Sequence, residues 1–351
     1  MASDTSDTDA RARTTQRGRI TVSGFDSEKV RERAQFSAGR SGLADATTSR
    51  RTKAWKRFKR NRSALIGAVL LAVMVLVAIF ARPIEVGLFG EQFTIQPFQL
   101  APHSTDTSLT EANLAPSAEH PFGTTDLGRD IASQVMVGAR YSLAIGVIAV
   151  GLAVGVGVPL GAVAGYYGGW VDETIMRLVD VLYAFPFLVL AIVIIAILGQ
   201  GFWNMILALV LVGWIGYARL IRGEILSVKQ NEYVTAAKAL GARDRSVIFR
   251  HIVPNAIAPV LVQATLAVGT TVLAAAALGF LGLGLEPGTP EWGTILSSGR
   301  EAIIRGYWWV TTFPGLAIVI FVLAVNLVGD GVRDALDPQD ETDDATQGGF
   351  R

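Results

Sequence analysis

Six apolar segments, each long enough to cross a lipid bilayer, constrain the fold of this chain most strongly. A membrane-spanning helix needs about 20 consecutive, predominantly apolar residues. Within the hydrocarbon core only helices and closed barrels satisfy all of their own backbone polar groups. We therefore predict an all-α, polytopic membrane protein with six transmembrane helices. The six segments lie near 64–81, 136–162, 178–199, 203–221, 256–285 and 308–329.

The composition agrees with a membrane protein and argues against several kinds of functional site. Hydrophobic residues make up 51% of the chain, and the mean hydropathy is +0.41. A net charge of +1 gives no sign of a nucleic-acid partner. Cysteine is absent, and His103, His120 and His251 are scattered along the sequence. We therefore expect neither a catalytic centre nor a metal site.

The distribution of Lys and Arg predicts the orientation of the chain in the membrane. Residues 1–63 contain 16 of these cations, the loop 82–135 contains two, and the loop 222–255 contains six. Cytoplasmic segments are enriched in Lys and Arg. With six spans, both termini and the loop 222–255 should therefore be cytoplasmic, and the loop 82–135 should lie outside the cell.

The same pattern divides the chain into segments. We expect a disordered cytoplasmic tail, a basic amphipathic helix on the membrane surface followed by the first span, a long extracytoplasmic loop, a membrane core with five spans, and an acidic cytoplasmic tail. In the same order, these segments are residues 1–52, 53–81, 82–135, 136–329 and 330–351.

The most polar stretch of the second half, Lys229–Pro259, is predicted to form a helix, a break and a second helix. Ala236 and Ala237 favour a helix, and Gly241 stands where that helix should end. Pro254 falls just before the next span. A short cytoplasmic helix with small side chains on one face suits docking of another protein. From these positions alone, an ordinary amphipathic loop is an equally good interpretation.

A second polar motif lies in the loop before the second span. Gly123 and Gly128 permit tight turns, and Asp126, Arg129 and Asp130 can pair locally. Such surface ion pairs contribute at most about 1 kcal/mol each.

Several polar residues and one proline lie within or beside the predicted spans. Arg177 and Asp180 are three residues apart, share a helix face and are expected to pair. Asp180 as part of a translocation route is the alternative. Pro186 should kink its span. Arg140 and Asn326 complete the set of intramembrane polar candidates.

Four stretches, in this order, resemble the permease subunits of ABC transporters of the dipeptide, oligopeptide and nickel type. They are residues 120–143, 229–259, 279–300 and 334–338. The basic helix and first span ahead of the long loop resemble the "C" permease subunit of binding-protein-dependent type I importers.

The second stretch resembles the signature of the loop that couples such permeases to their ATPases. Ala236, Ala237, Gly241 and Pro254 are in register with that signature. The departures are Thr235 in place of an acidic residue, His251 in place of Ile and Val253 in place of Leu.

This resemblance implies the six-helix fold of a type I ABC importer permease in a prokaryotic cell membrane. It implies a homologous permease subunit, two ATP-binding subunits that hold ATP and Mg²⁺, and an extracytoplasmic substrate-binding protein as partners. The chain has no phosphate-binding loop, so it should bind no cofactor and hydrolyse nothing itself. The residues implied in ATPase coupling are Glu232, Tyr233, Thr235, Ala236, Ala237, Leu240, Gly241, Ala242, Arg243 and Pro254.

Within this family, peptides are the expected substrate, and oligosaccharides or nickel complexes are the alternatives. A different class remains open, an ion-coupled secondary transporter with Asp180 and Arg140 as relay residues.

Overall fold

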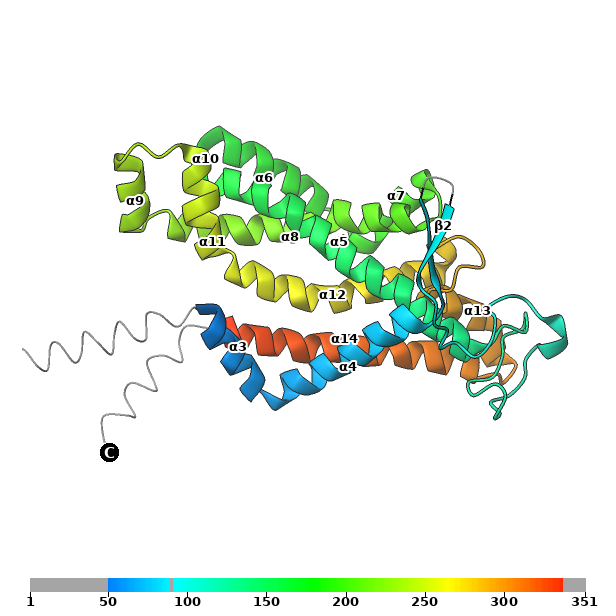
Figure 1. Ribbon diagram of the computed structural model, residues 1–351. Coiled ribbons are helices and arrows are strands. Elements are labelled where there is room, and N and C mark those ends of the chain that lie inside the picture. The colour runs from blue at the N-terminus through cyan, green and yellow to red at the C-terminus, as the bar shows by residue number, and fades with distance from the viewer. Residues whose placement is uncertain (1–49, 89–90, 337–351) are drawn as a thin grey trace, which may run out of the picture. The chain divides into compact units, whose positions relative to one another are not determined.

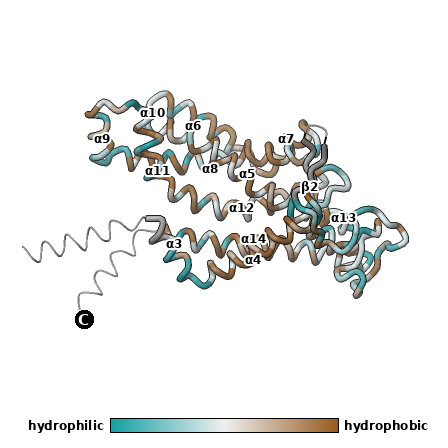
Figure 2. The backbone as a smooth tube through the Cα atoms, in the orientation of Figure 1, coloured by the Kyte–Doolittle hydropathy of each residue, from teal (hydrophilic) through white to brown (hydrophobic). Residues whose placement is uncertain are grey.

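Long apolar helices make up most of the computed structural model, which describes residues 50–88 and 91–336 (Figure 1). Within these residues, five helices are long and apolar enough to cross a membrane. Hydrophobic residues run along most of their length, as Figure 2 shows, which confirms the predicted helical membrane protein. The five are α4 (Arg62–Phe80), α5 (Ile131–Tyr167), α8 (Phe202–Val228), α12 (Ala258–Leu278, extended to Leu283 by a π-helix) and α14 (Trp309–Leu336).

The third predicted span is broken rather than merely kinked. It consists of α6 (Gly169–Tyr183) and α7 (Phe187–Leu198), which meet at an angle of 88°. Pro186 stands immediately before α7. Proline has no backbone N–H, and it disfavours helical geometry in the residue before it. Among the described residues, a sixth span is therefore present only if this bent pair is counted as one.

Helices α5 and α8 pack closely because α5 presents glycines to α8. A Cβ at Gly161 would lie 2.2 Å from the Ala218 carbonyl oxygen, and one at Gly157 would lie 2.5 Å from that of Trp214. By contrast, Gly155 has open space around it. Small residues let membrane helices approach within backbone contact. The glycines of α5 thus divide into a packed set and an open set.

The first span packs against the last. A Cβ at Gly67 of α4 would lie 2.7 Å from the Ala324 carbonyl oxygen of α14. At the end of this contact, Asn61 donates a hydrogen bond of 2.9 Å to Asp334. Helix α14 continues to Leu336, so the predicted acidic tail begins inside a helix.

The predicted tails fall largely outside the described residues. Residues 1–49 and 337–351 belong to this part, so the expected disordered tail is not addressed by the structure. The predicted basic helix is present as α3 (Arg50–Arg60), where the rings of Trp55 and Phe58 stack at 5.9 Å.

The loop between the first two spans contains more regular structure than the sequence indicated. Strands β1 (Ile84–Leu88) and β2 (Glu91–Gln96) pair as an antiparallel hairpin, and a 3₁₀ turn, η1 (Leu109–Glu111), follows. Another predicted loop contains helix α13 (Trp292–Ile304). We call the end of the bundle that carries these elements the hairpin end (Figure 1).

Candidate functional site

A short helix at the opposite end of the bundle carries the residues of the predicted coupling loop (Figure 1). This helix, α9, runs from Glu232 to Ala239, and we call this end the α9 end. Val234 is fully buried and anchors the helix to the bundle. Thr235, Ala236 and Leu240 are exposed, and the side chain of Leu240 is 89% accessible. The helix and Leu240, the residue that follows it, therefore expose small groups and one large apolar side chain.

Gly241 ends α9 in the way that the sequence predicted. Its φ is +80°, in the left-handed region that glycine adopts without steric cost. The Gly241 N–H donates to the Lys238 carbonyl at 2.9 Å, and the Ala242 N–H donates to the Ala237 carbonyl at 3.1 Å. These two bonds form a Schellman motif, which satisfies the last carbonyls of the helix. The predicted order of a helix, a break and a second helix is therefore confirmed.

The second helical part of the loop combines three short pieces. They are α10 (Asp244–Ser246), the π-helix η2 (Val247–Ile252) and α11 (Val253–Ala256). Pro254 is the second residue of α11, which continues η2 without a break. Val247, Ile248 and Ile252 are buried, so the π-helix is fixed to the bundle. Single π-turns inside helices often occur at functional sites.

Polar contacts join the coupling loop to the ends of α5 and α8. The Tyr166 hydroxyl donates to Asp244 at 2.6 Å, and the Lys238 ammonium lies 4.5 Å from the centre of the Tyr166 ring. The Lys229 ammonium donates to the Gly165 carbonyl at 2.8 Å. Through Lys238, α9 itself contacts the end of α5. Glu232, Tyr233 and Arg243, the other predicted coupling residues, are also exposed on this loop.

The connection between α5 and α6 is fixed to α8 as well. Arg222 of α8 donates from two guanidinium nitrogens to the two carboxylate oxygens of Asp172. Such a bidentate pair fixes orientation as well as distance. At the α9 end, polar contacts therefore link α5, α6, α8 and the loop that follows α8.

The glycine motif at the hairpin end forms tight turns, as predicted. Gly123 and Gly128 have φ values of +74° and +69°. A Cβ at Gly128 would lie 1.7 Å from the Ser108 carbonyl oxygen, which excludes any other residue there. The predicted pairing among the three charges is wrong, because Arg129 contacts Thr107 and Asp130 contacts His120. Asp126 is exposed.

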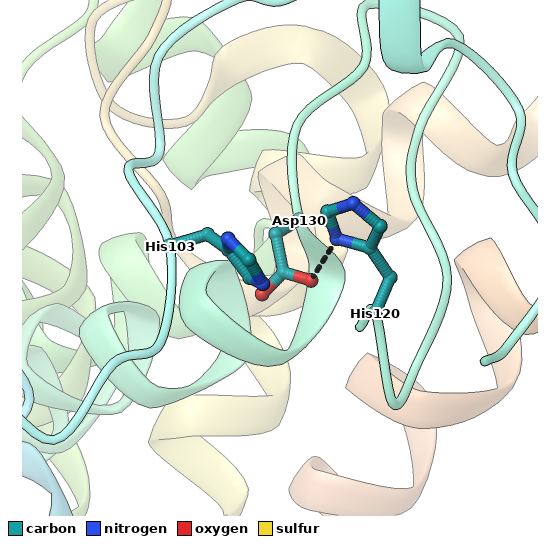
Figure 3. Close-up of side chains that lie close together, drawn as sticks. All are labelled: His103, His120 and Asp130. Carbon is teal, nitrogen blue, oxygen red and sulfur yellow. Dashed lines mark hydrogen bonds and ion pairs between the residues drawn. The ribbon is translucent and has the colours of Figure 1, made fainter. Parts of the chain in front are cut away.

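Two of the three histidines, far apart in sequence, meet at Asp130 (Figure 3). His120 Nδ1 lies 3.0 Å from Asp130 Oδ1, and the two imidazole ring centres are 4.5 Å apart. His120 and Asp130 are buried, and His103 is half-buried. The sequence-based argument that the histidines are scattered is therefore wrong for His103 and His120. Together the three residues form a cluster that could hold a metal ion.

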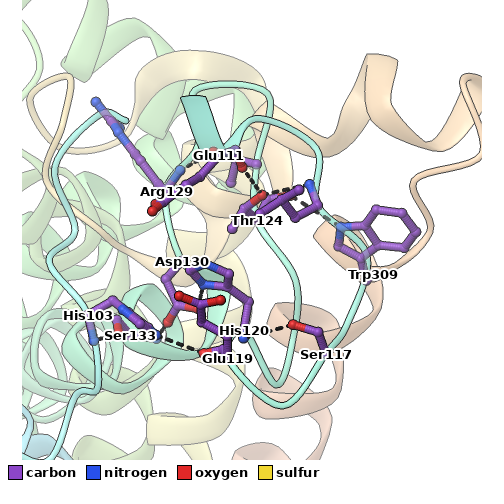
Figure 4. A network of polar contacts seen from close by, with 12 residues as sticks. His103, Glu111, Ser117, Glu119, His120, Thr124, Arg129, Asp130, Ser133 and Trp309 are labelled. Atoms are coloured by element: carbon purple, nitrogen blue, oxygen red, sulfur yellow. Dashed lines mark hydrogen bonds and ion pairs between the residues drawn. The ribbon is translucent and has the colours of Figure 1, made fainter. Parts of the chain in front are cut away.

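The cluster lies in a network that ties the loop 97–130 to the bundle (Figure 4). Asp130 caps α5 by accepting the Ser133 N–H at 2.7 Å. Thr124 accepts a hydrogen bond of 3.2 Å from the indole N–H of Trp309, in α14. This part of the loop is therefore held against α5 and α14 by hydrogen bonds.

The intramembrane polar residues do not converge on one site. Asp180 pairs with Arg219 of α8, and Arg177 pairs with Glu173 at 2.9 Å. The predicted pair of Arg177 and Asp180 is thus wrong, because α8 and the preceding helical turn supply closer partners. Asn326 is exposed on α14, apart from these pairs.

Arg140 contacts the end of the first span. Its guanidinium donates to the carbonyl oxygens of Ala78, Ile79 and Arg82 at 3.0, 3.0 and 2.7 Å. The last carbonyls of a helix have no partner within it. Arg140 of α5 therefore caps the end of α4.

A cavity that the sequence reasoning missed lies between α5, α7, α8 and α12. Its volume is about 630 Å³, and its wall is mainly apolar. Gln263, Thr270 and Thr271 of α12 and Tyr217 of α8 supply polar atoms. Gln263 inside an apolar run was the available signal, because polar groups at membrane depth are usually functional.

A buried carboxylate holds α13 at the hairpin end. Glu291 accepts hydrogen bonds from the Gly293 and Thr294 N–H groups, both at 2.9 Å, and from the Ser142 hydroxyl of α5. Burial raises the pKa of this carboxyl above its ordinary value, although the hydrogen bonds oppose the shift. Glu291 therefore joins the cap of α13 to α5.

Comparisons with known proteins identify the family of this architecture. Residues 157–339 match the family described as the binding-protein-dependent transport system inner membrane component. Residues 49–116 match the N-terminal transmembrane domain of oligopeptide transport permease C.

Curated relatives agree with these matches over most of the chain. The dipeptide transport system permease protein DppC of Alkalihalophilus pseudofirmus is 43% identical over 287 residues, 82% of this chain and 89% of that protein. The glutathione transport system permease protein GsiD of Escherichia coli O157:H7 is 43% identical over 288 residues, with 81% and 89% covered. DppC of Bacillus subtilis is 40% identical over 287 residues, with 82% and 85% covered.

Among solved structures, a chain of the inward-facing MetNI methionine ABC transporter superposes with a TM-score of 0.47 and 22% identity, covering 57% of this chain and 96% of that one. The family matches and the relatives lead to one assignment. This chain belongs to the binding-protein-dependent transport system inner membrane components, the permease subunits of ABC importers.

Proposed function

We propose that this chain forms half of the translocation pathway of an ATP-driven importer for dipeptides or oligopeptides, with a homologous permease subunit forming the other half. The relatives named for dipeptide and glutathione transport support a peptide substrate. The cavity between α5, α7, α8 and α12 supports a route on this face of the bundle, because it combines an apolar wall with a few polar atoms.

The observation that carries the coupling part of the proposal is the surface of α9. A helix anchored by the buried Val234 and exposing 89% of Leu240 has an apolar contact ready for a protein partner. One ATP-binding subunit docks here, and a second docks on the homologous permease. Those subunits bind ATP and Mg²⁺, and their closure supplies the free energy that shifts the spans between two states.

The contacts of the coupling loop indicate how this closure reaches the pathway. Tyr166 and Lys229 join the loop to the cytoplasmic ends of α5 and α8. Both helices line the cavity. A push on α9 therefore moves two walls of the route together.

The orientation follows from the charge pattern and the fold. The start of α4 and the end of α14 meet through Asn61 and Asp334, at the α9 end (Figure 1). The Lys and Arg content of residues 1–63 supports a cytoplasmic location for this end. The loop 97–130 and α13 then face outward, where a substrate-binding protein delivers its cargo.

Two substitutions at one residue test the docking assignment. Gly241→Val should abolish uptake of a labelled dipeptide, because a β-branched residue does not tolerate a φ of +80°. Gly241→Asn should retain most uptake, because asparagine adopts this conformation readily. Nothing lies within 4 Å of the position for an added Cβ, so both variants should still insert in the membrane. Normal uptake by Gly241→Val would contradict the docking role.

A pull-down of the tagged chain from mild detergent tests the partners, with the subunits identified by mass spectrometry. Recovery of a second permease and ATP-binding subunits is the expected result. The purified complex, supplied with its binding protein, should then show ATPase activity stimulated by dipeptides and not by disaccharides. Stimulation by disaccharides alone would overturn the peptide assignment and leave the importer assignment in place.

A further inference from the structure

We propose that His103, His120 and Asp130 form a binding site for a divalent transition-metal cation of the Zn²⁺ class at the hairpin end (Figure 3). One potential ligand atom from each residue lies within 4.8 Å of the others. The transport function does not require such a site. It would hold a resident structural ion that is distinct from the cargo.

The backbone positions the three residues before any ion binds. The His103 N–H donates to the Ser133 hydroxyl at 3.0 Å, and Ser133 is fully buried in the first turn of α5. The His120 N–H donates to the Ser117 hydroxyl at 3.1 Å. Asp130 is fixed as the cap of α5 through its Oδ2 atom. A preorganised set of donors lowers the ordering cost of binding.

The donor atoms are those that Zn²⁺ prefers. Zinc sites commonly combine imidazole nitrogens and carboxylate oxygens with metal–ligand distances of about 2.0–2.2 Å. Tetrahedral ligands at those distances are about 3.3–3.6 Å apart. Ion binding therefore has to open the 3.0 Å between His120 Nδ1 and Asp130 Oδ1 slightly and bring the third ligand atom, now within 4.8 Å, to the same spacing. His103 is the half-buried member of the cluster, and its Nε2 lies 2.8 Å from the Glu119 carbonyl oxygen.

Binding would cross-link two distant parts of the loop to α5. His103 and His120 are 17 positions apart, and Asp130 begins the second span. Mg²⁺ and Ca²⁺ prefer sites made of oxygen atoms, so they should bind weakly to a pair of imidazoles and one carboxylate.

The test compares Zn²⁺ binding by the full-length chain and three variants, each purified in mild detergent with its accompanying subunits and stripped with a chelator. His103→Gln keeps a donor for the Glu119 carbonyl. His120→Asn places an amide N–H near the position of Nδ1, so it can still contact Asp130. His251→Gln is the matched control, because His251 lies in the π-helix η2 at the α9 end. Zinc content, calorimetric affinity and the thermal midpoint with Zn²⁺ or Mg²⁺ are measured.

The expected result is one more equivalent of Zn²⁺ in the wild type and in His251→Gln than in the other two variants. Zn²⁺ should raise the thermal midpoint in the same two proteins, since a ligand that binds only the folded state stabilises it. The affinity should fall at least tenfold in His103→Gln and in His120→Asn. Equal zinc binding by all four proteins, or no binding at millimolar Zn²⁺, would overturn the proposal. Because two different variants lose a ligand, misfolding of one does not decide the outcome.

Discussion

The close packing of α5 on α8 predicts opposite effects for alanine at two glycines of the same helix. Gly161 faces α8, whereas Gly155 has open space around it. We therefore compare Gly161→Ala with Gly155→Ala. Each variant adds one methyl group to α5, so the pair differs only in what that group meets.

The structure gives the size of the difference. The new Cβ at position 161 would lie 2.2 Å from the Ala218 carbonyl oxygen and 2.5 Å from a methyl group of Ile221. The carbonyl belongs to the backbone of α8 and cannot rotate away, so the helices must separate. Overpacking of this kind costs about 1–3 kcal/mol. Both variants gain up to about 1 kcal/mol of helix propensity, because alanine replaces glycine. The free energies of unfolding should therefore differ by about 1–3 kcal/mol.

The assay is equilibrium unfolding of the purified chain in detergent micelles, followed by circular dichroism. Gly155→Ala should be at least as stable as the wild type, and Gly161→Ala should be less stable than Gly155→Ala. Equal stability of the two variants, or a more stable Gly161→Ala, would refute the reasoning that backbone contact holds α5 against α8.

Two further predictions concern carboxylates. Asp180→Asn should leave uptake largely intact, because Asp180 pairs with Arg219 and is not among the residues that line the cavity between α5, α7, α8 and α12; loss of uptake by a folded, assembled variant would instead place Asp180 in the pathway. The raised pKa of Glu291 means that the folded state retains its proton to a higher pH than the unfolded state does. The free energy of unfolding should therefore fall as the pH rises from about 4.5 through the raised pKa. In Glu291→Gln, this contribution to the pH dependence of the free energy of unfolding should be absent from unfolding curves recorded between about pH 4.5 and 7. An unchanged pH dependence of the free energy of unfolding in Glu291→Gln would contradict this prediction.

The elements that could be predicted from the sequence are those encoded locally. Spans follow from runs of apolar residues, and the end of α9 follows from one glycine after an alanine-rich helix. The β-hairpin is not predictable in the same way, because Pro83 and Pro97 on either side of it are typical of irregular loops. In the fold the two prolines flank the hairpin, where the missing N–H does no harm.

The spacing of residues along the sequence does not predict contacts between distant parts of the chain. The spacing predicts Arg177, three residues away, as the partner of Asp180, whereas the structure pairs Asp180 with Arg219 of another helix. The meeting of His103 with His120 depends on how the loop folds back onto the start of α5. Hydropathy and motif spacing carry no information about either contact.

The Arg140 cap makes the first helix an integral part of the membrane core. The two matched family segments, residues 49–116 and 157–339, could suggest an anchor joined to an independent transport module. Arg140 lies between them in sequence, in the part of α5 before residue 157, and it donates to three carbonyls at the end of α4. Without α4, this cation would lose these acceptors, and an unpaired charge inside a protein is costly. The first helix is therefore tied to the rest of the bundle in folding, and a chain shortened to begin at α5 would start with a cation that lacks these acceptors.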